Sequence, residues 1–191
     1  MLWDDFLNSD YHDWRGTGWS EDRLDKPGWL ARWLDEYGLP NPGIPSPDEL
    51  GELKRMRSDM LRIVQSLIAG ESLSPSDMDN LNAILSEGSV RYRLIQADGG
   101  FRLETSPSRA DWNGVRAQIA ASFARMLEQG EPSRLRICGN PDCLWVYYDE
   151  TKNRSKRYCD DKMCGNLMKV RRFRAKRKAS QDVQGPETPS N

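Results

Sequence analysis

All four cysteines of this 191-residue chain lie in CGNPDCLWVYYDETKNRSKRYCDDKMC, residues 138–164. Their spacing is C-x4-C-x15-C-x4-C, which gives two close pairs, Cys138 with Cys143 and Cys159 with Cys164. A tetrahedral zinc site needs four soft ligands at about 2.3 Å from the metal, and two close pairs supply them at a low cost in loop closure. The pattern therefore predicts zinc. Because four thiolates leave no position for water, the zinc would be structural rather than catalytic.

Other uses of clustered cysteines stay open beside zinc. Two disulfides would need an oxidising compartment, whereas the first residues, MLWDDFLNSD, lack the basic leader and apolar core of a secretory signal. We therefore expect a reducing cytoplasm. A redox pair favours C-x-x-C in a thioredoxin-like context, which is missing here. An iron–sulfur cluster could use four thiolates, but the spacing fits neither ferredoxin pattern well.

The residues around the cysteines predict a small zinc-binding fold. Gly139 and Pro141 suit a tight turn between the first two cysteines. Residues 144–148 form a strand-like run, residues 149–155 are turn-like, and residues 156–158 could return the chain as a second strand. The second cysteine pair leads directly into a helical pattern. A turn, a hairpin and a helix in this order are the plan of a treble-clef zinc finger.

The net charge of −1 hides an uneven distribution. Residues 131–180 carry 14 Lys and Arg against 6 Asp and Glu, while the remainder carries 14 against 23. A basic module attached to an acidic body suggests a polyanionic partner, and we expect nucleic acid to be bound by the basic end. Charge alone does not separate DNA from RNA. The candidate contact residues lie between the two cysteine pairs and after the last cysteine: Arg154, Lys156, Arg157, Lys169, Arg171, Arg172, Arg174 and Lys176.

The sequence before residue 130 predicts a mostly helical body. Helices are expected near residues 27–37, from the capping box at Ser46 to Gly70, from the cap at Ser74 to about residue 85, and over 108–128. Residues 90–103 alternate apolar and basic side chains around ADGG, which predicts one small antiparallel hairpin. The expected fold class is α+β, a mostly helical N-terminal domain with a small hairpin, followed by a treble-clef-like zinc finger.

The composition changes at two places along the chain. GEPS at residues 130–133 is a turn-rich joint at which the charge balance changes sign. After Ala179 the sequence becomes SQDVQGPETPSN, which is typical of a disordered tail. We therefore expect domains over 1–130 and 134–178 and a tail over 179–191. The longest apolar run is only a few residues, so we expect no membrane span.

Several front residues could line a small-molecule site, although clustered tryptophans at helical spacing more often form ordinary core. His12, the only histidine, lies near two aspartates and could do acid–base work, but a lone histidine more often has no such role. No nucleophile elbow, phosphate loop or paired-carboxylate motif surrounds it, so we expect no enzyme. The candidate ligand-binding residues are Asn8, His12, Trp29 and Trp33.

The cysteines, with Gly165 and Asn166 after the last one and a basic helix behind them, resemble the CGNR zinc-finger family. The front resembles that family's N-terminal ABATE domain, in FLNSD and in LARWLDEYGLP. The resemblance implies a bacterial stress-induced transcription regulator. It also implies an effector-sensing front domain, a finger held by the four cysteines, and a helix that contacts DNA. Leu167 departs from the family, which carries arginine at that position.

The expected function is therefore a zinc-containing, DNA-binding transcription regulator, with a small-molecule effector as a further possible partner. The alternative is a zinc-stabilised RNA-binding or protein-interaction module, in which Trp145, Tyr147 and Tyr148 would present a stacking surface. If the family's arginine contacts phosphate or a base, Leu167 weakens or changes DNA binding. If that arginine packs structurally, Leu167 extends the core.

Overall fold

A computed structural model describes residues 1–107 and 109–183. The described chain forms two compact units. The first contains Met1–Tyr11 and Glu21–Leu135, and the second contains His12–Ser20 together with the chain from Arg136 onward. The second unit is thus built from two separate stretches of sequence. Across the described residues, no helix is both long and apolar enough to cross a bilayer.

Five α-helices make up most of the first unit: α1 (Leu2–Leu7), α2 (Pro27–Glu36), α3 (Pro47–Ile68), α4 (Pro75–Glu87) and α5 (Trp112–Gln129). The predicted capping box at Ser46 and the predicted cap at Ser74 are both present. The Ser46 hydroxyl accepts from the Glu49 amide, and the Ser74 hydroxyl accepts from the Asp77 amide. Each cap satisfies amide groups that the first helical turn leaves without partners, so these helices begin where the sequence predicts.

The core of this unit is rich in aromatic side chains. Trp3 packs against Phe123 with ring centroids 5.7 Å apart, and Phe6 packs against Trp33 at 6.1 Å. On α3 the buried residues include Met60 and Ile63, whereas Ile68 at the helix end is 41% exposed. The α+β fold class expected from the sequence is confirmed.

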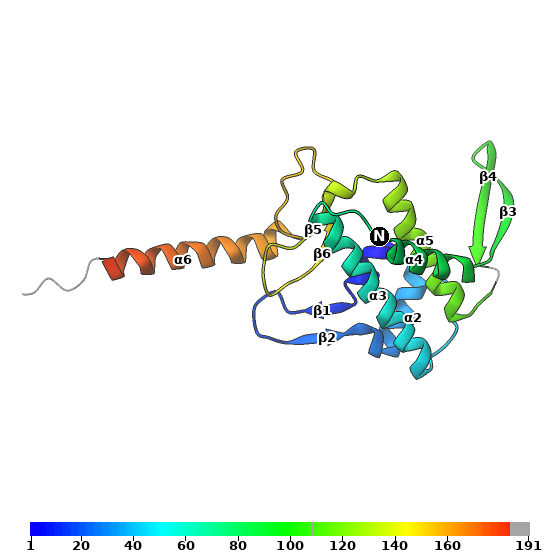
Figure 1. Cartoon of the computed structure of the whole chain (residues 1–191), viewed down its shortest axis with the longest axis horizontal. Helices are drawn as coiled ribbons and strands as arrows, with labels where there is room; N and C mark the ends of the chain where they lie inside the picture. Colours follow the sequence, from blue (N-terminus) through cyan, green and yellow to red (C-terminus); the bar gives the residue numbers. More distant parts are fainter. Residues whose placement is uncertain (108, 184–191) are drawn as a thin grey trace, which may run out of the picture. The chain divides into compact units, whose positions relative to one another are not determined.

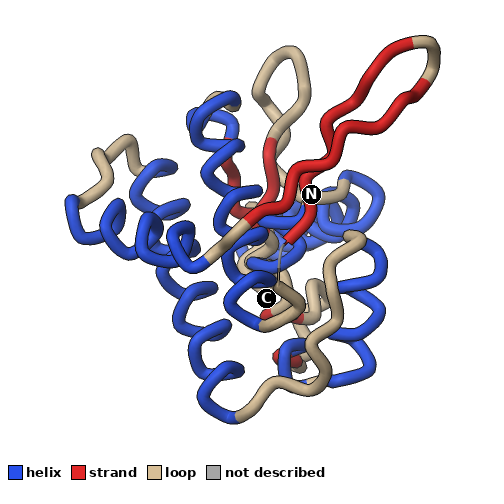
Figure 2. Tube along the Cα trace, turned by 90° about the vertical axis from the view of Figure 1, so that its right-hand side faces the viewer, coloured by secondary structure: helices blue, strands red, loops and turns tan. Residues whose placement is uncertain are grey.

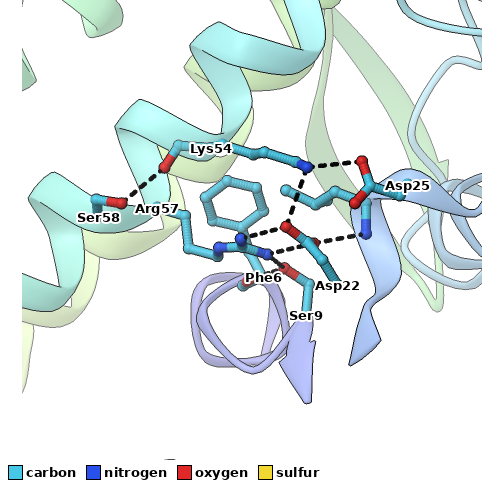
Figure 3. Close-up of polar contacts among 8 residues, drawn as sticks. Phe6, Ser9, Asp22, Asp25, Lys54, Arg57 and Ser58 are labelled. Carbon is cyan, nitrogen blue, oxygen red and sulfur yellow. Dashed lines mark hydrogen bonds and ion pairs between the residues drawn. The ribbon is translucent and has the colours of Figure 1, made fainter. Parts of the chain in front are cut away.

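A polar cluster joins the short N-terminal segments to α3, as Figure 3 shows. Arg57 contacts both carboxylate oxygens of Asp22 at 2.7 and 2.8 Å and also donates to the Ser9 hydroxyl at 2.8 Å. Lys54 adds contacts to Asp25 at 2.6 Å and to Asp22 at 3.2 Å. Asp22 also caps η1 (Arg23–Asp25) by accepting from the Leu24 amide. Planar, two-point pairing of this kind fixes geometry as well as charge.

The predicted hairpin is present as β3 (Val90–Ala97) and β4 (Gly100–Pro107), paired antiparallel with Leu94 opposite Leu103. Asp98 and Gly99 form its turn, and both have positive φ, 48° and 79°. This is the backbone that a tight two-residue hairpin requires. Figures 1 and 2 show that the hairpin extends beyond the helices next to it, α4 and α5.

The second unit contains β5 (Leu135–Ile137) at its edge, β6 (Val146–Tyr148), a π-helical turn η3 (Asp161–Gly165) and helix α6 (Asn166–Val183). β5 pairs with β6, so the hairpin encloses the first cysteine pair. The expectation of a strand at residues 156–158 is wrong, because that segment has no strand structure. Its backbone instead makes a hydrogen bond to the turn between the first two cysteines: the Gly139 amide donates to the Arg157 oxygen at 2.8 Å.

Two shorter features complete the description. β1 (Asp10–His12) pairs with β2 (Ser20–Asp22), and the loop between them belongs to the second unit. Helix α6 continues through residues 179–183, the first part of the predicted tail. Residues 184–191, the rest of that tail, lie outside the described residues.

Candidate metal centre and nucleic-acid interface

The structure brings the sulfur atoms of Cys138, Cys143, Cys159 and Cys164 together, all within 4.8 Å of one another. The Cys143 and Cys159 sulfurs are 3.7 Å apart, and those of Cys159 and Cys164 are 3.8 Å apart. A tetrahedron with metal–sulfur bonds of about 2.3 Å has edges of about 3.8 Å. A disulfide would need about 2.05 Å, so the cysteines are free thiols spaced as zinc ligands are.

The thiols also influence one another's protonation. Hydrogen bonds from Cys143 and Cys159 lower the pKa of Cys138 to about 2, because they stabilise its thiolate. Donating to that thiolate raises the pKa of Cys143 to about 12 and also raises the pKa of Cys159. A divalent cation among the sulfurs would replace these protons and favour all four thiolates. The donor set therefore fits zinc in both spacing and chemistry.

The first cysteine pair is held by main-chain hydrogen bonds of a tight turn. The Cys138 amide donates to the Trp145 oxygen at 2.8 Å, and the Cys143 amide donates to the Asn140 oxygen at 3.0 Å. Gly139 sits so close to the Arg157 carbonyl that a Cβ here would lie 2.9 Å from its oxygen. Only glycine allows that approach, which is the physical reason for the residue type between Cys138 and Asn140.

The second pair is positioned by η3. The Asp160 side chain accepts from the Met163 amide at 2.7 Å and caps the turn. The Gly165 amide donates to the Asp160 oxygen at 3.0 Å, which places Cys164 on the inner side, 1% exposed. The Cys159 amide points at the Cys138 sulfur, 3.5 Å away. Amide groups aimed at sulfur stabilise thiolate charge and orient metal ligands.

The loop His12–Ser20 forms one wall of the cysteine cluster. Trp14 packs against the buried cysteines together with Trp145 and Met168. The main-chain oxygen of Trp14 accepts a hydrogen bond from the Asn140 side chain at 2.7 Å. The same Asn140 nitrogen lies 3.5 Å from the Cys164 sulfur. Neither Trp14 nor Asn140 was predicted from the sequence to belong to the site. For Trp14 this is because nothing local in SDYHDW indicates contact with residues more than 120 positions later.

Arg171 joins helix α6 to that loop. Its guanidinium bonds to the Asp142 carboxylate at 2.5 Å and to the main-chain oxygen of Arg15 at 3.0 Å. Gly16 lies against this pair, because a Cβ on Gly16 would be 2.5 Å from Arg171 Nη2. Arg171 was predicted to contact nucleic acid. In this structure its guanidinium holds parts of the second unit together.

Residues 150–158, between β6 and Cys159, form a basic loop. Its backbone is held by hydrogen bonds to Asp149, which is fully buried. Asp149 accepts from the Thr151 amide and hydroxyl at 3.0 and 2.6 Å and from the Lys156 amide at 3.0 Å. Burial raises the pKa of Asp149, but these hydrogen bonds outweigh it and the pKa is lowered overall. The anchored backbone leaves the side chains of Arg154 and Arg157 exposed.

Beside this loop lies a hollow of about 270 Å³. Its lining includes Lys156, Arg157 and Lys169, with Asp161 as an acidic member. Lys169 is on the first turns of α6, so the hollow connects the loop to the helix. Two segments that the sequence predicted separately to be basic therefore meet at one surface.

Helix α6 exposes most of its basic residues. Lys169, Arg172, Arg174 and Lys176 are all exposed, in contrast to Arg171. Phe173 is 67% exposed among them. At 100° per residue, Phe173 lies between Lys169 and Arg177 on the face opposite Arg171. Phe173 was missed by sequence reasoning, although an aromatic residue in the run VRRFRAKRK is a visible signal.

The prediction that Trp145, Tyr147 and Tyr148 present a stacking surface is wrong for Tyr147. Tyr147 is only 6% exposed, and its hydroxyl donates to the Lys156 oxygen at 2.8 Å. Trp145 packs against the cysteine core. Leu167, at the family's arginine position, is half-buried.

The candidate ligand residues of the front lie on different elements. Trp29 and Trp33 stack at 5.6 Å on α2, and Asn8 is buried at the end of α1. His12 belongs to the second unit. A cavity of about 110 Å³ beside α2 is lined by Leu30, Ala31 and residues between α2 and α3, including Asn41 and Pro45. Its lining does not include Trp29 or Trp33.

Comparison with protein families gives two matches along the chain. Residues 2–130 match the ABATE model, described as "Putative stress-induced transcription regulator", and residues 134–177 match the CGNR zinc finger. No curated protein matches the chain significantly. Together with the sulfur geometry, the finger match supports a structural Zn²⁺, so the predicted cofactor is confirmed. Since the first match covers well over half of its length, the chain belongs to the ABATE family and carries a CGNR zinc finger behind that domain.

Proposed function

We propose that this protein is a transcription regulator whose finger binds duplex DNA through α6 and the basic loop. In this proposal Cys138, Cys143, Cys159 and Cys164 hold the zinc and keep both elements in place. The observation that carries it is the exposed cationic face of α6, with Phe173 among the basic residues. The family description supports the same class of function.

The dimensions of α6 suit a duplex. Its 18 residues span about 27 Å at 1.5 Å per residue, and the major groove of B-DNA admits an α-helix. Lys and Arg on such a helix neutralise phosphates, while an exposed aromatic side chain can contact a thymine methyl group. The hollow lined by Lys156, Arg157 and Lys169 would hold one phosphate of the backbone.

Binding to duplex DNA at several salt concentrations tests this. We expect a steep loss of affinity with salt, with a slope of roughly −0.9 per phosphate contact. The double variant Arg172→Glu with Lys176→Glu should weaken binding. It should also reduce the steepness of the slope by the equivalent of about two phosphate contacts. Arg32→Glu with Arg55→Glu, exposed positions of the first unit, is the matched control and should leave binding unchanged.

The competing function is RNA binding, and Phe173 is the observation that keeps it in view, because exposed aromatic residues stack on unpaired bases. A single-stranded RNA competitor separates the two. If RNA displaces the duplex at equal or lower concentration, or if the α6 variant and the control behave alike, the DNA proposal fails.

An effector for the front unit stays a prediction. Pockets for small ligands usually have about 300–1,000 Å³. The cavity beside α2, at about 110 Å³, is well below that size. A sensing role would therefore need a ligand of a few atoms there or a different site. Thermal unfolding of the first unit in the presence of small-molecule panels would identify one by a rise in Tm.

A further inference from the structure

The β3–β4 hairpin has one apolar face and one basic face. Because strands alternate their side chains, Val90, Tyr92 and Leu94 share a face of β3, and the register places Phe101 and Leu103 on that same face of β4. Arg91, Arg93, Arg102 and Glu104 lie on the other face. Neither DNA binding nor the family description accounts for this division.

The apolar face is largely uncovered. Tyr92 is 64% exposed, Leu94 65%, Phe101 77% and Leu103 59%. The sheet consists of β3 and β4, and both views show the hairpin extending beyond α4 and α5 (Figures 1 and 2). A two-stranded hairpin is marginally stable in water, and contiguous exposed apolar patches usually mark contact surfaces.

We propose that this face is a dimerisation surface, on which the apolar face of one hairpin packs against the same face of a second copy of this chain. A two-fold contact places a surface against itself, so a charged surface would repel its copy. The apolar face carries no charged side chain, while the arginines stay outside the contact. This inference goes beyond the proposed DNA binding and does not depend on it.

The available area is enough for a pair. With the exposed fractions given above and 42% for Val90, the five apolar side chains offer roughly 500 Å² per copy, taking 150–250 Å² for each aromatic side chain. Two copies would bury up to about 1,000 Å², which reaches the lower limit of specific interfaces and fits a dimer that dissociates on dilution. A membrane is the poorer occupant, since the arginines would point away from anionic head groups when the apolar face is buried.

Light scattering of the full-length, zinc-loaded protein in the absence of nucleic acid tests the proposal. We expect a concentration-dependent mass near twice 21.9 kDa. Leu94→Glu with Phe101→Glu should give a monomer, because each charge would face its own copy across the two-fold axis. Arg91→Gln with Arg93→Gln changes the net charge by the same amount on the opposite face and should remain a dimer.

A wild-type protein that stays monomeric at tens of micromolar, or a dimer that both double variants keep or both lose, would overturn the proposal. Circular dichroism and zinc content check that the variants fold. A photo-crosslinking residue in place of Leu103 gives an independent measurement in an otherwise unaltered chain. An adduct to β3 or β4 of the other copy is expected, whereas an adduct to any other element, or capture by lipid vesicles as a monomer, contradicts it.

Discussion

Asn140 donates a hydrogen bond from its side-chain nitrogen to the main-chain oxygen of Trp14, 2.7 Å away and 126 residues earlier in the chain. The same nitrogen lies 3.5 Å from the Cys164 sulfur, and the Asn140 side chain is fully buried. One amide group therefore connects the loop His12–Ser20 to the cysteine cluster. A buried polar group in this position stabilises the finger only while both partners stay in place.

We expect Asn140→Ala to weaken zinc binding. The change leaves the Trp14 oxygen without its donor and removes a contact to a metal-ligating sulfur, and the loss of such outer contacts typically costs 10–100-fold in metal affinity. Competition with a chromophoric chelator measures this. Asn153→Ala, at an exposed position of the basic loop, is the control. Equal zinc affinity in the two variants would show that the Asn140 contacts do not stabilise the site.

We expect Gly16→Ala to detach the loop from the finger. Gly16 has a φ of +83°, and an added Cβ would lie 2.5 Å from Arg171 Nη2 and 2.8 Å from Asp142 Oδ2. Gly18 has a similar φ of +77° but open space around it, so Gly18→Ala carries the backbone strain without the clash. Hydrogen exchange of residues 12–20 should accelerate much more in Gly16→Ala. Identical exchange in both variants would mean that backbone strain alone acts.

The sequence predicted the elements of this protein better than their partners. The caps at Ser46 and Ser74, the turn at Asp98 and Gly99 and the cysteine spacing are local signals, and each is present in the structure. Trp14 gave no such signal, because what it packs against depends on chain-distant contacts that periodicity does not encode.

Helix α6 shows the same limit of local sequence signals. A run of arginines predicts a basic surface, but it does not tell which arginine pairs internally. Asp142, directly before Cys143, pairs with Arg171, whereas Arg172 and Arg174 stay exposed. Likewise, the strand-like residues 144–148 had a strand partner before the cysteines, at β5, instead of after them. Short strands pair by tertiary context more than by propensity.

We expect acid to weaken the first unit partly through Asp22. Burial raises the pKa of Asp22, but the hydrogen bonds from Arg57, the Leu24 amide and Lys54 outweigh it and the pKa is lowered overall. A carboxylate with a lowered pKa in the folded state adds stability above its unfolded pKa of about 3.9. That stability is lost as the pH falls through the folded value.

Asp22→Asn should therefore lower the free energy of unfolding at neutral pH by about 1–3 kcal/mol, because Arg57 loses its ionised partner. It should also reduce the dependence of stability on pH below about 4. Urea unfolding at several pH values measures both effects. Asp59→Asn, which removes an exposed pair with Arg62, should change stability by less than about 1 kcal/mol. If Asp22→Asn loses as much stability in acid as the unaltered protein does, other carboxylates cause that loss.

We expect zinc removal to unfold the second unit and leave the first one folded. The core of the second unit is the four cysteines with Tyr147 and Tyr158, so without metal it has few apolar contacts to replace the metal–sulfur bonds. The first unit has its own buried core, including Trp3, Phe6 and Phe123. Hydrogen exchange after chelation should show lost protection over 136–165 and retained protection in α3 and α5.

The segment whose exchange best tests this prediction is the loop of residues 12–20. Because Trp14 packs against the cysteine cluster, this loop should lose protection with the finger and regain it when zinc is restored. Its sequence neighbours Asn8 and Leu24 should stay protected throughout. A loop that stays protected without zinc would mean that the first unit, and not the finger, holds it.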